Sequence, residues 1–153
     1  MSGSDYSTSH KLFDYEGSIK WEKHLGYTSR QHISENGKLI VIDEESSRLT
    51  AYNREGDIVW KYQITTGIIQ SWSASRDGRY VAVAVFDYMR WRPNRLLLLE
   101  HGETVWDVYR VGAVAVSLMV SPNNKFIVLA SWAEPFTFIT LYSINGETLW
   151  LLR

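Results

Sequence analysis

The chain has 153 residues, of which 45% are hydrophobic, 14% aromatic and 22% charged, with 16 basic and 17 acidic side chains and no cysteine. This composition excludes a disordered, collagenous or coiled-coil protein, and the length predicts a single domain with a substantial core. The net charge of −1 argues against a protein that binds nucleic acid through the phosphate backbone. The lack of cysteine excludes disulfides, a thiolate nucleophile and Cys-ligated zinc.

The N-terminal segment, MSGSDYSTSH, has neither the basic nor the apolar region of a signal peptide. We interpret residues 1–10 as a flexible polar leader and assign residues 11–153 to one domain. The longest nearly apolar run, residues 111–120, is about half as long as a membrane span, so no span is predicted. The sequence does not determine the location, but the lack of a signal peptide and of cysteine favours the cytoplasm.

Residues 11–15 and 19–23 read as two short β-strands, and the second carries the first copy of a Gly-x-x-x-Trp pattern. The pattern recurs three more times, with the tryptophans 39, 46 and 44 residues apart. Because it holds four of the seven tryptophans, it indicates an internal structural repeat. The four copies are Gly17–Trp21, Gly56–Trp60, Gly102–Trp106 and Gly146–Trp150.

A second repeated pattern, Ser-x-Asx followed by Gly or Asn, predicts a hairpin turn in each of three longer units. Asn-Gly and Asp-Gly allow the positive φ angles of a tight turn, and Asn is the next most tolerant residue. Each unit reads as four short strands, the last carrying the tryptophan, whereas residues 11–23 supply only the last two strands. No stretch has a capped helical period, so the chain is predicted to be all-β. The turns are Ser34–Lys38, Ser75–Arg79 and Ser121–Lys125, and the complete units are residues 31–62, 70–109 and 114–152.

Four antiparallel strands in about 40–50 residues is the size of a β-propeller blade. The Ser-x-Asp-Gly-Arg-Tyr-Val-Ala-Val segment at residues 75–83 resembles the first hairpin of WD40-like propellers. The Gly-Glu-x-x-Trp endings at residues 102–106 and 146–150 resemble quinoprotein-like (PQQ-like) repeats. We prefer the second family because the Gly-His and terminal Trp-Asp pairs of WD40 repeats are absent. That resemblance implies a possible PQQ cofactor, but the repeat occurs widely without one, and no cofactor is predicted.

Three full blades and a half blade are fewer than the roughly four to eight of a closed propeller. An open arc would leave apolar faces and unpaired strands exposed. We therefore expect a homodimer that closes a ring of seven or eight blades, or association with a larger chain or a different protein. The tryptophans of the repeat are expected to form the core between blades; they are Trp21, Trp60, Trp106 and Trp150.

The sequence offers no evident catalytic site. The four histidines lack metal-ligand spacing, and no nucleophile or phosphate-binding motif occurs. We predict a non-enzymatic interaction scaffold. The competing hypothesis is a ligand-binding or enzymatic propeller whose central channel presents Gln70, Ser71 and Ser73.

Two loops are candidate partner-binding surfaces. Arg90, Trp91 and Arg92 lie in the longest predicted loop, and Arg and Trp are enriched in binding hot spots. The predicted loop over residues 131–137 adds Trp132 and Phe136, and both loops would project from the same rim of a propeller. Alternatively, these aromatic residues pack over the blade edges. Basic and aromatic loops can also stack single-stranded nucleic acid, but the net charge argues against that function.

Overall fold

The computed structural model describes residues 8–87, 92–109 and 114–153, and these residues form fourteen β-strands and no helix. The strands are β1 (Thr8–Phe13), β2 (Ile19–Leu25), β3 (Thr28–Ile33), β4 (Ile40–Glu44), β5 (Arg48–Tyr52), β6 (Ile58–Gln63), β7 (Ile68–Ala74), β8 (Tyr80–Asp87), β9 (Arg92–Glu100), β10 (Glu103–Tyr109), β11 (Val114–Val120), β12 (Phe126–Ala133), β13 (Phe136–Ser143) and β14 (Thr148–Leu152). The first strand begins at Thr8, so the last three residues of the predicted leader belong to β1.

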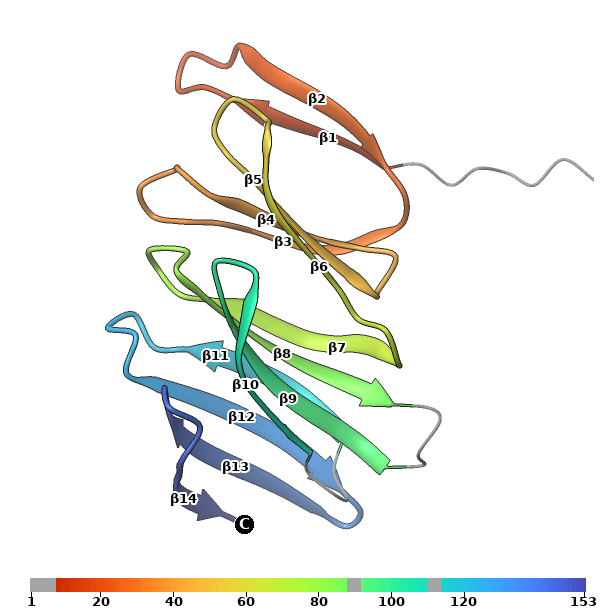
Figure 1. The fold of residues 1–153 in the computed structure, drawn as a ribbon, viewed down its shortest axis with the longest axis vertical. Coiled ribbons are helices and arrows are strands. Elements are labelled where there is room, and N and C mark those ends of the chain that lie inside the picture. Colours follow the sequence, from red (N-terminus) through yellow and green to blue (C-terminus); the bar gives the residue numbers. More distant parts are fainter. Residues whose placement is uncertain (1–7, 88–91, 110–113) are drawn as a thin grey trace, which may run out of the picture.

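Within each sheet, successive strands of the chain pair antiparallel, giving three four-stranded sheets, β3–β6, β7–β10 and β11–β14, and the two-stranded sheet β1–β2. The sheets follow one another in chain order, each packed against the next (Figure 1). The predicted all-β chain of four-stranded antiparallel units is confirmed. The arrangement is consistent with propeller-like blades.

The hydrophobic core is divided among the three junctions between successive sheets. On β8, Val81, Val83 and Val85 pack toward β3–β6, whereas Ala82 and Ala84 pack toward β11–β14. Successive side chains of a strand point to opposite faces, so a sheet between two neighbours buries both sets. This explains the apolar run over residues 80–86, which does not alternate with polar residues.

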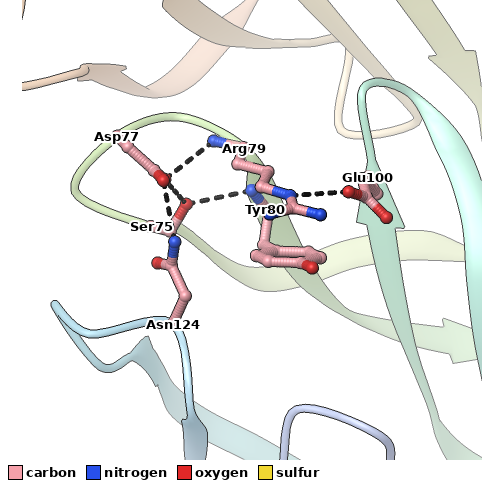
Figure 2. Close-up of polar contacts among 6 residues, drawn as sticks. All are labelled: Ser75, Asp77, Arg79, Tyr80, Glu100 and Asn124. Carbon is pink, nitrogen blue, oxygen red and sulfur yellow. Dashed lines mark hydrogen bonds and ion pairs between the residues drawn. The ribbon is translucent and has the colours of Figure 1, made fainter.

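The predicted hairpin turns share one set of hydrogen bonds, shown for residues 75–80 in Figure 2. Ser75 Oγ donates to Asp77 Oδ1 at 2.7 Å and accepts from the Tyr80 amide at 2.9 Å, while Asp77 Oδ1 accepts from the Arg79 amide at 3.0 Å. The same three bonds recur in the other two turns, where Asn36 and Asn123 replace the aspartate. A short polar side chain two residues after the serine therefore closes each turn.

These turns also join neighbouring sheets. Asn124 Nδ2 donates to Asp77 Oδ2 at 2.7 Å, as Figure 2 shows. Arg76 forms an ion pair with Glu35 of the preceding turn, and the Glu35 amide donates to the Arg76 carbonyl at 2.8 Å. Burial opposes the ionisation of Asp77, but hydrogen bonds from Ser75, the Arg79 amide and Asn124 outweigh it and lower the pKa of this carboxyl.

The first strand of the second full sheet makes a further set of links between sheets. Gln70 Oε1 accepts from the Ala115 amide at 3.3 Å, and Ser73 Oγ accepts from the Val120 amide at 3.2 Å. Arg30 Nη1 donates to Ser71 Oγ at 3.0 Å. The polar groups considered for a channel ligand therefore satisfy groups on the adjacent sheets.

Candidate functional site

The glycine of each repeated Gly-x-x-x-Trp turn lies against the tryptophan of the preceding sheet. A Cβ atom on Gly56 would lie 2.9 Å from Trp21 Cδ1, and one on Gly102 would lie 2.8 Å from Trp60 Cγ. Both glycines have φ angles near +90°, at +90° and +84°. The position therefore needs glycine for its backbone conformation and for close approach to the indole.

The third junction repeats this contact. A Cβ atom on Gly146 would lie 3.1 Å from Trp106 Cδ2, and Trp106 Nε1 donates to the Ile144 carbonyl at 2.7 Å. Trp60 is only 9% exposed. Trp21, Trp60 and Trp106 thus lie between sheets, as the repeat predicts for this position.

Trp150 differs from the other three tryptophans. No glycine turn covers it within the described part of the chain, and it is 46% exposed. It pairs with Leu141, and Leu141 pairs with Val128, so the three side chains lie on one face of the last sheet. In this structure Trp21, Trp60 and Trp106 each lie against a glycine turn of the next sheet, and Trp150 does not.

The face around Trp150 is apolar. On the opposite face, Ile127, Leu129 and Tyr142 pack against β7–β10. Met119, paired with Val128, is 61% exposed, and Leu152 is 58% exposed. We call this surface the open face, and it comprises Met119, Val128, Trp132, Leu141, Trp150 and Leu152.

The opposite end of the stack has polar side chains paired across its two strands. On β1–β2, Glu22 accepts a hydrogen bond from Ser9 at 2.6 Å and lies 3.4 Å from Lys11 Nζ. The Ser9 hydroxyl and the Lys11 charge lower the pKa of Glu22. Gly17, in the turn of this sheet, has φ +85°, and a Cβ atom there would meet no atom within 4 Å. One end therefore has an uncovered tryptophan and the other an uncovered glycine turn.

The predicted partner-binding residues do not form one described surface. Arg90 and Trp91 lie outside the described residues, and Arg92, whose backbone alone is described, is the first residue of β9 and lies opposite Asp87. Trp132 and Phe136 lie in strands joined by a two-residue turn, not in the longer loop predicted for residues 131–137.

The strand register separates the two aromatic residues. Phe136 pairs with Ala133, which is next to Trp132 on the strand, so Phe136 and Trp132 lie on opposite faces. The Arg153 guanidinium lies 3.5 Å from the Phe136 ring centroid. Trp132 therefore belongs to the open face, whereas Phe136 contacts a local cation.

Sequence reasoning missed Met119, Leu152 and Gly17 as candidate interface residues. Within residues 1–153, no Gly-x-x-x-Trp pattern follows Trp150 and no repeat tryptophan precedes Gly17, and this pattern singles out both residues. Met119 and Leu152 could be assigned to the open face only from the strand register.

Three further features would bear on function, namely a metal site, a ligand pocket and a membrane-spanning helix. Among the described residues, no three His, Asp or Glu side chains are grouped as a metal would require. A shallow hollow of about 270 Å³ lies between β3 and β7, and its walls include Arg30, His32 and Trp72. Burial lowers the pKa of His32, which favours its neutral form. In the part of the chain that the structure describes, no helix is long and apolar enough to cross a membrane.

Comparison with known proteins supports the fold but no family. No family model matches the chain, and no curated protein matches it. Among solved structures 755 chains match, and one of them is described as the crystal structure of the eukaryotic initiation factor. Its sequence is 12% identical, the TM-score is 0.67, and the match covers 95% of this chain and 42% of that chain. The chain thus spans less than half of that protein's length, and the similarity shows the fold alone.

Proposed function

We propose that this protein is a non-enzymatic β-propeller scaffold that binds another polypeptide through the open face of its last sheet. The observation that carries the proposal is the exposure of Trp150, because a glycine turn of the next sheet covers each of the other three repeat tryptophans. The succession of four-stranded antiparallel sheets, each packed against the next, supports the propeller architecture.

The open face provides a driving force for association. Soluble monomers rarely expose large contiguous apolar patches, and such patches mark interaction sites. Trp150 is 46% exposed. At about 25 cal/mol per Å² and about 250 Å² for a whole tryptophan, covering its exposed part contributes roughly 2–3 kcal/mol. Leu152 and Met119 add exposed apolar area on the same face.

Association through the open face would extend the series of packed sheets toward a closed ring. The described residues form three four-stranded sheets and one two-stranded sheet, whereas a closed propeller has roughly four to eight blades. A partner that covers the open face continues the series of packed sheets. A homodimer would contribute twice the sheets of one chain, which suits a ring of seven or eight blades.

The proposal is tested by measuring mass in solution by light scattering behind a sizing column, over a wide range of protein concentrations. The variant is Trp150→Glu, and the matched control is Val59→Glu, which changes a 53% exposed residue on the last strand of another sheet. Wild type and control are expected to exceed the chain mass of 17.7 kDa, and Trp150→Glu to return to it. If Trp150→Glu keeps the wild-type mass, the open face is not the binding surface.

A monomeric wild type would direct the test to a different polypeptide. A photo-reactive residue at position 152 should then crosslink to a polypeptide in an extract of the cells that make the protein, whereas the same residue at position 59 should not. If position 152 yields no such product, the scaffold proposal fails.

A further inference from the structure

We infer that the open face binds the Gly17 turn of a second copy of this chain, in a head-to-tail contact. This inference rests on the proposed function and names the partner. The three junctions within the chain show what covers a face of this type, namely a turn whose glycine lies against the indole. Trp150 lacks such a glycine and Gly17 lacks such a tryptophan, so two copies can complete the same contact between them.

The Gly17 turn already has the conformation that the contact requires. The Asp14 amide donates to the Ser18 carbonyl at 3.0 Å, and the Gly17 amide donates to the Asp14 carbonyl at 3.1 Å. Asp14 Oδ1 also accepts from the Ser18 amide at 2.9 Å. The turn is therefore closed by both backbone and side-chain bonds before any partner arrives.

The turn that covers Trp21 has the same bonds. There the Asn53 amide donates to the Asp57 carbonyl at 2.9 Å, and the Gly56 amide donates to the Asn53 carbonyl at 3.1 Å. Asn53 Oδ1 accepts from the Asp57 amide at 2.7 Å, as Asp14 does from Ser18. The turn at Gly146 repeats the two backbone bonds. The uncovered Gly17 turn thus has the same backbone bonds as two of the three covered turns, whereas Gly102 lies in a two-residue turn between β9 and β10.

The surroundings of the Gly17 turn fit an apolar partner. Tyr15 and Ile19 flank the glycine, and both are exposed. Lys11, at the position equivalent to the buried Thr50 of the next sheet, lies 3.4 Å from Glu22, so its charge keeps a partner when this face is covered. Two copies that make this contact twice form a ring with a two-fold axis, whereas a rotation that does not close would give a filament.

The first test is the variant Gly17→Asn, with Gly37→Asn as its matched control. Both glycines have positive φ, at +85° and +64°, and a Cβ atom at either meets nothing within 4 Å of its own chain. Asparagine tolerates this conformation better than other side chains. At each of the three covered glycines, an added Cβ atom would lie 3.1 Å or less from the nearest atom of the tryptophan. In the proposed contact, an asparagine side chain would therefore enter the space of the second copy's Trp150 at position 17 but not at position 37.

Light scattering is expected to give twice 17.7 kDa for wild type and Gly37→Asn, and 17.7 kDa for Gly17→Asn. Equal unfolding midpoints for the two variants at low concentration would show that the mass change is not caused by misfolding. A monomeric wild type, or a Gly17→Asn variant with the wild-type mass, overturns the inference. If Trp150→Glu alone abolishes association, the proposed function stands and a different element occupies the open face.

Mixing the two disrupted chains tests the head-to-tail geometry directly. Gly17→Asn retains an intact Trp150, and Trp150→Glu retains an intact Gly17, so an equimolar mixture can form one normal contact although neither variant can do so alone. We expect the mixture to contain a species of twice the chain mass. A contact between two open faces would show no such rescue, and that result overturns the inference.

Discussion

Replacing Gly102 by alanine tests the idea that a glycine–tryptophan contact holds each pair of sheets together. A Cβ atom at this position would lie 2.8 Å from both Cβ and Cγ of Trp60, which is buried between two sheets. Forcing atoms into a well-packed core typically costs about 1–3 kcal/mol. Alanine at a positive φ angle adds about 1 kcal/mol of backbone strain. We therefore expect Gly102→Ala to lower the free energy of unfolding by about 2–4 kcal/mol.

The matched control separates the two contributions. Gly37 also has positive φ, but a Cβ atom there meets nothing within 4 Å, so Gly37→Ala should show only the backbone strain of about 1 kcal/mol. Urea unfolding followed by far-ultraviolet circular dichroism measures both values, provided that the slopes agree. Equal losses of stability in the two variants would refute the argument that close approach to the indole requires glycine.

Two further predictions concern a turn and the two faces of the sheets. Asp77→Asn should lower the free energy of unfolding by about 0.5–1 kcal/mol at neutral pH, because the exposed carboxylate is screened and asparagine can keep the turn bonds. Since folding lowers the pKa of Asp77, its stabilisation is present above the ordinary carboxyl pKa and lost as pH falls through the lowered value. The difference from wild type should thus vanish in strong acid, and a constant difference in urea titrations across pH would contradict this. Leu98→Ala, at a fully buried position, should lower the free energy of unfolding by about 2–5 kcal/mol. Leu152→Ala, made in the Trp150→Glu background, should lower it by less than about 0.5 kcal/mol because Leu152 is exposed. Comparable losses of stability in the two variants would contradict the assignment of the open face.

Local patterns were sufficient to predict the strands and their grouping. Ser-x-Asx turns mark the first hairpin of each sheet because the serine and Asx side chains close the turn themselves. Each predicted four-strand unit, such as residues 70–109, lies within a few residues of an observed sheet, here Ile68–Tyr109. These features depend on residues that are close in sequence, and the pattern therefore contains them.

Features that depend on packing between sheets were not predictable in the same way. Ser73 is a polar residue on an inner strand whatever it contacts, and only the structure shows its bond to the Val120 amide. Trp132 and Phe136 flank a proline and suggested an aromatic loop, but their strands continue to a two-residue turn that places them on opposite faces. The four repeat tryptophans are equivalent in sequence, and they differ only in whether a glycine turn follows in space.

The two ends of the stack differ in the kind of surface that a contact with a partner would bury. The β1–β2 end carries an ion pair across its strands, between Lys11 and Glu22. The open face has Trp150 and Leu152 instead. Because a surface ion pair contributes at most about 1 kcal/mol, whereas the exposed part of Trp150 alone contributes roughly 2–3 kcal/mol on burial, assembly should depend far more on Trp150 than on Lys11.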